Sequence, residues 1–247
     1  MIDDYNVYKF SKKECIQYMI LGGVGCLLTA SLFYSNLLLS FVLIPFIPFY
    51  LKNIKRKLIA QRKWQLNIEF RDGLLCLSAA LNASYSLENA FIQAVEDLRL
   101  LYRDNSLIVI EFEGIVHQIH MNVTVESIIE DLGRRSGIED IMYFSEVLKT
   151  AKRTGGDLIQ VIRTTSKIMS DKLEVKREIV TLITAKKLEA NIMIIVPFGI
   201  VLYLKLFSPE FLVPLYHNLF GIIFMTIILL CIYGISRIAS KIMDIQV

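Results

Sequence analysis

The residues best suited to chemistry lie in one short stretch, where Glu113, His117 and His120 recur at intervals of four and three residues. On an α-helix this spacing places the three side chains on one face, where they are potential metal ligands. No matching set of ligands accompanies them elsewhere, and Ile115 and Ile119 indicate a helix that simply has one polar and one apolar face. We therefore expect no metal site and no cofactor.

Other signs of catalysis are also missing from the sequence. Its four cysteines are widely spaced and form no paired motif, which argues against a zinc site or a disulfide framework. The apolar segments carry no paired carboxylates, Ser/Lys dyad or HExxH motif, as an intramembrane enzyme or metal transporter would require. Since there is also no Walker-type glycine loop, any ATP-derived energy must come from a partner. The sequence favours a protein that is not an enzyme.

A different group of residues has the types and spacing of a joint between helices: Gly155, Gly156, Asp157 and Leu158. A glycine pair suits the end of a helix, where a left-handed residue satisfies the last carbonyls. Asp157 is suited to cap the next helix through its side-chain oxygen. No Pro or Gly interrupts the helical pattern that follows until Pro197. We expect one long helix that connects a soluble body to a membrane anchor.

The composition indicates a chain that lies partly in water and partly in a membrane. Hydrophobic residues make up 54% of it and the mean hydropathy is +0.51, yet 21% of the residues are charged. Most of the charges fall between residues 52 and 190, so the ends form the apolar part. The 27 Lys and Arg residues nearly balance the 24 Asp and Glu residues, which argues against binding of nucleic acid.

Four apolar segments form two predicted transmembrane hairpins, over residues 16–34 and 37–51 and over residues 191–207 and 218–236. The second segment is shorter than the hydrocarbon core, so it must recruit flanking residues, thin the bilayer, or dip into the membrane and return. Basic residues next to these segments place the middle of the chain and both termini in the cytoplasm. The predicted divisions are a cytoplasmic N-terminus (1–15), a hairpin (16–51), a helical domain (52–190), a second hairpin (191–236) and a cytoplasmic tail (237–247).

The middle of the chain shows successive helical patterns with short breaks and no convincing strand alternation. Ser86 is a predicted N-cap, helices are expected to open at Ser106 and Thr124, and Ser136 with Glu139 matches a capping box. Apolar stripes run over residues 70–81, 87–101, 108–119, 123–132 and 141–148, followed by the long helix. The sequence thus predicts an all-α polytopic membrane protein with a cytoplasmic antiparallel helical bundle between two transmembrane hairpins.

Several of these stretches, in this order, carry a resemblance to a known family. They are Phe70-Arg71-Asp72 to Leu81, Tyr85 to Phe91, Gly155 to Leu158, Glu174 to Ile183, and Pro197-Phe198. The chain resembles the F domain of type II secretion and type IV pilus inner-membrane platform proteins. With one copy flanked by two apolar hairpins, it is most similar to the TadB/TadC branch of tight-adherence (Flp) pilus systems. The resemblance covers roughly Arg62 to the end. Ser84 departs from it, because Gly is usual at that position.

The resemblance implies a scaffold in the inner (cytoplasmic) membrane that couples a hexameric secretion ATPase to pilin extraction and fibre assembly. Its cytoplasmic helices would contact the ATPase, and its membrane helices would meet pilin subunits and a sister platform protein or a second copy. Independently, Arg134, Arg135, Lys152 and Arg153 are candidate partner contacts near the ends of two helices, where cations also suit the helix dipole. The alternative function is a membrane signalling adaptor or receptor whose bundle binds a soluble partner.

Overall fold

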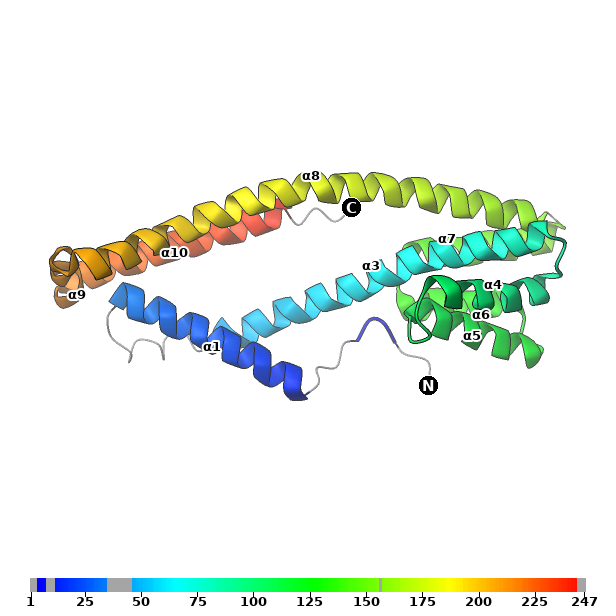
Figure 1. Ribbon diagram of the computed structural model, residues 1–247, viewed down its shortest axis with the longest axis horizontal. Coiled ribbons are helices and arrows are strands. Elements are labelled where there is room, and N and C mark those ends of the chain that lie inside the picture. The colour runs from blue at the N-terminus through cyan, green and yellow to red at the C-terminus, as the bar shows by residue number, and fades with distance from the viewer. Residues whose placement is uncertain (1–3, 8–11, 35–45, 156, 244–247) are drawn as a thin grey trace. The chain divides into compact units, whose positions relative to one another are not determined.

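The computed structural model describes residues 4–7, 12–34, 46–155 and 157–243 (Figure 1). The regular structure in these ranges is entirely helical, with no strand, which confirms the all-α prediction. The helices are α1 (Lys12–Tyr34), α3 (Phe46–Asn82), α4 (Leu87–Leu101), α5 (Leu107–His120), α6 (Val125–Ser136), α7 (Glu139–Thr154), α8 (Leu158–Phe207), the short 3₁₀ helix η2 (Pro209–Phe211), α9 (Val213–His217) and α10 (Leu219–Met243).

The chain divides into two compact units. Unit 1 comprises Met1–Lys9 and Lys55–Val175, and unit 2 comprises Phe10–Ile54 and Lys176–Val247. Both divisions fall inside helices, so α3 and α8 each contribute residues to both units. Figure 1 shows α4 to α7 grouped together in unit 1.

Aromatic side chains form the centre of the unit 1 core. Phe70, Phe91, Phe112 and Phe144 are all buried and come from α3, α4, α5 and α7. The ring of Phe70 lies 6.4 Å from that of Phe112 and 5.8 Å from that of Phe144, in edge-on geometry. Gly73 permits this approach, because a Cβ there would lie 2.5 Å from Cζ of Phe112. The core thus joins helices that are distant in sequence.

The predicted apolar stripes of the bundle are confirmed as the buried faces of α3 to α7, except at Leu101 and Val123. Leu101 is the last residue of α4 and is 64% exposed, and Val123 precedes α6 and is 38% exposed. In α8, where Ile168 is predicted to share the apolar face, Ile162 and Met169 are buried and Ile168 lies to one side of them, 60% exposed. Helical periodicity thus identifies the correct helices and misplaces single residues.

Two helices of the bundle receive caps from carboxylate or hydroxyl groups. The Ser86 Oγ accepts a hydrogen bond from the Asn89 N–H at 3.4 Å, which confirms the predicted cap of α4. At α5, Ser106 occupies the N-cap position without a side-chain cap among the described residues. Glu69 of α3 replaces it, because its Oε2 accepts from the Ile108 N–H at 3.0 Å. A buried carboxylate therefore ties α3 to the start of α5.

The capping box predicted for Ser136 and Glu139 is wrong. Ser136 is the last residue of α6, and its Oγ donates a hydrogen bond to the Gly133 carbonyl oxygen at 3.1 Å. Gly137 follows in the left-handed conformation, with φ +58°, and ends α6. The N-cap of α7 is instead Ile138, and the helix begins at Glu139. Because Gly137 is used to end α6, the next residue, Ile138, takes the N-cap position of α7.

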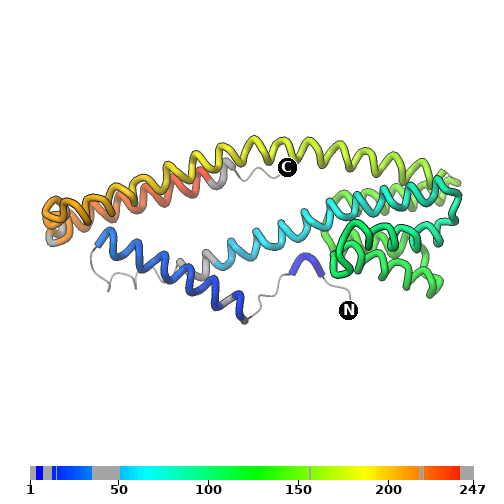
Figure 2. Tube along the Cα trace, in the orientation of Figure 1, coloured from blue at the N-terminus to red at the C-terminus, as the bar shows by residue number. Residues whose placement is uncertain are grey.

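Unit 2 holds the most apolar helices of the described chain. Three helices are long and apolar enough to cross a membrane: Ile16–Tyr34 in α1, part of Leu158–Phe207 in α8, and Phe220–Ala239 in α10. Their apolar side chains are mostly exposed, as expected for helices that contact lipid. Pro197 lies inside α8, which is continuous as predicted. Figures 1 and 2 show α10 returning alongside the second half of α8.

Contacts within unit 2 bring the carboxyl-terminal end of α1 next to the carboxyl-terminal part of α8. The Lys205 Nζ, near the carboxyl end of α8, donates a hydrogen bond to the Ser31 carbonyl oxygen at 2.5 Å, near the carboxyl end of α1. The rings of Phe33 and Phe198 lie 5.4 Å apart. Tyr216 of α9 also lies at this end, because its hydroxyl donates to the Leu32 carbonyl oxygen.

The second predicted membrane segment, residues 37–51, lies largely outside the described residues. Its last part, residues 46–51, forms the start of α3, which continues through Lys52 to Asn82 without a break. The predicted division between the first hairpin and the helical domain therefore falls inside a helix.

Candidate functional site

A groove between α6 and α7 contains two of the predicted partner contacts. Close packing of these helices is possible because Gly133 lacks a side chain, since a Cβ there would lie 3.3 Å from the Met142 backbone. The groove has a volume of about 450 Å³. It is lined by Thr124, Glu126, Ser127, Glu130, Lys149, Lys152 and Arg153.

Charges in the groove are arranged by helix, with acidic residues on α6 and basic residues on α7. The Lys152 Nζ lies 2.9 Å from the Glu126 Oε1, and that glutamate is only 9% exposed. A looser pair joins Lys149 and Glu130 at 3.5 Å, with both side chains exposed. An exposed pair stabilises a protein little, so Lys149 and Glu130 exchange their contact for contacts with a partner at low cost. The groove is thus suited to recognising a polar protein surface.

The four predicted partner contacts fall in different environments. Lys152 and Arg153 line the groove, and Arg134 is exposed, with its guanidinium 3.4 Å from the Glu130 carboxylate. Arg135 differs, because only 18% of its side chain is exposed. The partner-binding prediction therefore stays open for the exposed residues, whereas Arg135 has an internal role in this structure.

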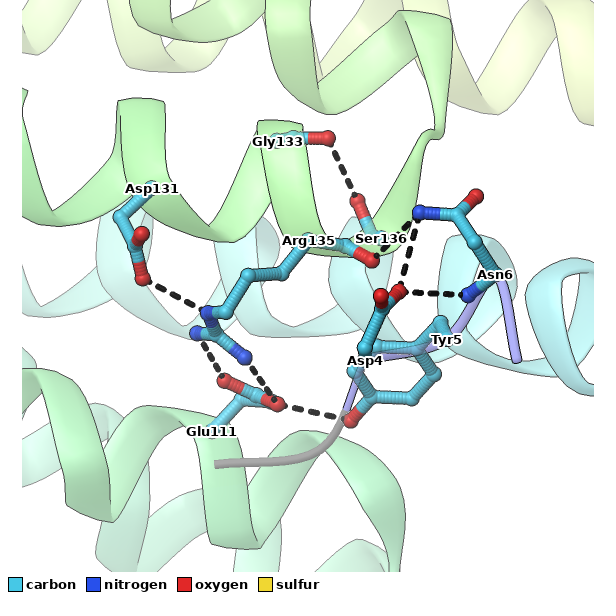
Figure 3. Close-up of polar contacts among 8 residues, drawn as sticks. All are labelled: Asp4, Tyr5, Asn6, Glu111, Asp131, Gly133, Arg135 and Ser136. Carbon is cyan, nitrogen blue, oxygen red and sulfur yellow. Dashed lines mark hydrogen bonds and ion pairs between the residues drawn. The ribbon is translucent and has the colours of Figure 1, made fainter. Parts of the chain in front are cut away.

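Arg135 belongs to a buried polar cluster between α5 and α6 (Figure 3). Its Nη2 lies 2.9 Å from the Glu111 Oε2, its Nη1 donates to the Glu111 Oε1 at 3.2 Å, and its Nε donates to the Asp131 Oδ2 at 2.6 Å. Burial alone would lower the pKa of Arg135, but these carboxylate hydrogen bonds outweigh it and raise the pKa. The guanidinium therefore stays charged, as a buried carboxylate requires.

A short N-terminal segment completes the cluster, as Figure 3 shows. Tyr5 is 3% exposed, and its hydroxyl donates to the Glu111 Oε1 at 2.7 Å. Its backbone N–H and the Asn6 side chain both donate to the Arg135 carbonyl oxygen. Burial and the adjacent Glu111 carboxylate raise the pKa of Tyr5, so the hydroxyl remains a donor. We call residues 4–7 the N-terminal strap.

Sequence reasoning did not identify the cluster. One signal was present, because Glu111 falls between Ile108 and Ile115 on the apolar face of its helix, where an acid requires a partner. The partners themselves could not be inferred, because Tyr5 is 106 residues away and Arg135 is 24 residues away.

The predicted joint between α7 and α8 has the expected geometry. Gly155 is left-handed, with φ +70°, and follows the last residue of α7. The Asp157 Oδ1 accepts hydrogen bonds from the Ile159 N–H at 2.9 Å and the Gln160 N–H at 3.2 Å, which confirms the predicted cap of α8. Leu158 is the first residue of that helix. Gly156 lies outside the described residues.

The potential metal ligands do not form a site in the described part of the chain. The carboxylate of Glu113 lies 2.5 Å from the guanidinium of Arg99. His117 and His120 lie in the last turn of α5. Among the described residues, no group of three His, Cys, Asp or Glu side chains is placed to hold a metal ion.

Comparison of the chain with protein-family models, with curated proteins and with solved structures gives no match. The geometry of the bundle, the joint and the apolar helices is therefore the basis for a functional assignment.

Proposed function

We propose that this chain is a platform protein of a type II secretion or tight-adherence (Flp) pilus machine in the cytoplasmic membrane. In this role unit 1 is the cytoplasmic body that a hexameric ATPase contacts. The apolar helices of unit 2 hold the protein in the membrane and meet pilin subunits and a sister platform protein. The chain itself carries out no catalysis.

The observation that carries this proposal is the continuity of α8. This helix of 50 residues begins in the bundle at Leu158, passes the charged residues Lys186 and Glu189, and ends in apolar sequence at Phe207. At about 1.5 Å per residue it is roughly 75 Å long. A helix that is packed into a soluble bundle at one end and apolar at the other is suited to transmit displacement from motor to membrane.

The N-terminal strap supports the proposed orientation in the membrane. Tyr5 and Asn6 bind to the bundle, so residues 4–7 and unit 1 lie on the same side of any membrane. Between them the chain contains the apolar helix Ile16–Tyr34, which crosses once in this proposal. The chain must then return before Lys55. The first hairpin crosses the membrane twice, which returns the chain to the side where it started.

The direction of the helices in unit 2 is compatible with the same orientation. The carboxyl ends of α1 and α8 are joined by the contact of Lys205 with Ser31, so both helices cross from inside to outside. The short helices η2 and α9 then lie outside, and α10 returns the chain to the cytoplasm.

Charge reversal at Arg153 in the groove and at Arg134 beside it tests the proposal. We expect Arg134→Glu together with Arg153→Glu to reduce co-purification of a hexameric secretion ATPase from the same organism by about tenfold, because each exposed contact contributes up to ~1 kcal/mol. Arg135 is excluded from this variant, since reversal there would disrupt the buried cluster. The matched control is Arg103→Glu with Lys167→Glu, which are exposed and lie outside the groove.

Unchanged ATPase recovery with the groove variant would argue against this docking face. If the wild-type protein captures no secretion ATPase, but a different soluble protein binds in a groove-dependent manner, the signalling-adaptor alternative is favoured. The polar groove is compatible with both the platform role and the adaptor role, and the identity of the bound partner distinguishes the two.

A further inference from the structure

The first half of α3 carries an uninterrupted basic cluster. Lys52, Lys55, Arg56 and Lys57 are followed by Arg62 and Lys63, and the first acidic residue of the helix is Glu69. The cluster starts directly after the apolar residues 46–51 of the same helix. It is therefore the most one-sided distribution of charge in the described chain.

The distal part of this cluster is occupied by the N-terminal strap. The Lys63 Nζ donates hydrogen bonds to the Asn6 Oδ1 at 2.6 Å and to the Gly137 carbonyl oxygen at 3.4 Å. The Arg62 guanidinium lies 4.7 Å from the centroid of the Tyr5 ring. These two cations have partners within unit 1.

The proximal cations Lys55, Arg56 and Lys57 have no such partner. None of the three forms an ion pair or side-chain hydrogen bond with another residue in the described part of the chain, and Arg56 and Lys57 are exposed. In contrast, Lys152 and Lys172 in the same unit lie 2.9 and 2.5 Å from a carboxylate. Three adjacent cations without an intramolecular counter-charge form a concentrated positive charge that is available to an external anion.

We propose that Lys55, Arg56 and Lys57 bind the headgroups of anionic phospholipids at the cytoplasmic surface of the membrane. At ~1.5 Å per residue, Lys55 lies about 6 Å along the helix axis from Leu51, the last residue of the apolar stretch, which is the depth of lipid headgroups. A lysine or arginine near an anionic membrane surface strengthens its binding about fivefold.

Continuity with the apolar stretch distinguishes this surface from a site for an acidic protein or nucleic acid. Both of those partners would require a basic face in the aqueous part of unit 1, where most cations already have carboxylate neighbours. The inference rests on the proposed membrane orientation and is independent of the platform role.

Native mass spectrometry of the full-length protein, released from detergent micelles, tests the inference. The protein is equilibrated with equal concentrations of phosphatidylglycerol and phosphatidylcholine, and the bound lipids are counted. We expect an excess of bound phosphatidylglycerol. In the variant Lys55→Gln/Arg56→Gln/Lys57→Gln, we expect the ratio of the two lipids to fall at least fivefold.

Two further variants serve as controls. Arg103→Gln/Lys149→Gln/Lys167→Gln removes the same charge elsewhere in unit 1 and is expected to retain the ratio. Lys55→Arg/Lys57→Arg keeps the charge and is expected to behave as the wild type. Emission of Trp64, the only tryptophan, reports whether each variant has folded.

Equal binding of the two lipids by the wild type would overturn the inference, as would an unchanged ratio in the triple Gln variant. Displacement of phosphatidylglycerol by inorganic phosphate would also overturn it, since the site would then recognise a free anion. Recovery of the wild type in the soluble fraction of cells would instead refute the proposed membrane orientation, so the two failures are distinguishable.

Discussion

At the scale of single residues, the Glu111 carboxylate depends most strongly on a partner, because it is a charged group that is only 3% exposed. Arg135→Met removes its counter-charge, and we expect a loss of about 3–5 kcal/mol in the free energy of unfolding. The double variant Glu111→Met/Arg135→Met leaves no buried charge, so it should recover most of that loss. Urea unfolding of the full chain in detergent, followed at Trp64, measures both. A single variant that loses less than about 1 kcal/mol would contradict the structure.

A second residue-scale prediction concerns the Cys76 thiol on α3. Burial, with the nearby Asp97 and Asp72 carboxylates, raises its pKa to about 11. A raised pKa favours the neutral thiol, so reactive thiolate is scarce at neutral pH and increases as the pH rises toward 11. In a variant whose other cysteines are serine, we expect alkylation at pH 8 to be about a hundredfold slower than for a thiol of ordinary pKa. A rate that levels off below pH 9 would contradict this.

Single residues were the least predictable level of the structure. Arg134 and Arg135 are adjacent and chemically identical, yet one is exposed and the other is buried against Glu111. Their side chains point to different sides of α6, and only that of Arg135 meets Glu111, which is 24 residues away in the sequence. Ser84 is left-handed with φ +66°, a backbone conformation that glycine adopts without strain.

At the scale of elements, the joint between α7 and α8 is the position most sensitive to backbone conformation. We expect Gly155→Val to disfavour the left-handed turn by about 1–2 kcal/mol and to abolish fibre assembly, while the protein still inserts in the membrane. No described atom lies within 4 Å of the position that a Cβ would occupy, so the effect would come from the backbone alone. Electron microscopy of surface fibres and membrane fractionation measure the two outcomes.

The control for this joint is Gly155→Asn, because asparagine tolerates the left-handed region. It should retain fibres, and normal piliation in the valine variant would refute the proposed role of the joint.

Helix boundaries were predictable where a cap is local and not where it comes from another helix. Ser86 and Asp157 cap helices that begin at the next residue, so the sequence was sufficient. The start of α5 is capped by Glu69, which is 39 residues away. At Ser136 the capping-box pattern was present, but Gly137 had already ended the previous helix. A local capping motif does not form where the preceding helix still occupies its residues, and the sequence alone does not show where that helix ends.

At the scale of the whole molecule, segregation of charge predicted a helical body and apolar helices, because burial and lipid exposure both follow hydrophobicity. The predicted limits at residues 51 and 190 lie inside α3 and α8, which pass from one unit to the other. Composition changes along a helix without a break in its hydrogen bonds, so it does not mark the end of an element.

The orientation of the chain is the prediction on which the functional proposal depends most. Tyr5 binds to unit 1, so Val7 and Lys167 should lie on the same, cytoplasmic side of the membrane, whereas Glu210 should lie outside. All three residues are exposed. In a background without the native cysteines, each is replaced by cysteine and treated in intact cells with a membrane-impermeant maleimide. We expect labelling at position 210 only, and at positions 7 and 167 after permeabilisation. Labelling of position 167 in intact cells would exclude contact with a cytoplasmic ATPase, and opposite results at positions 7 and 167 would show that the strap does not bind the bundle in the cell.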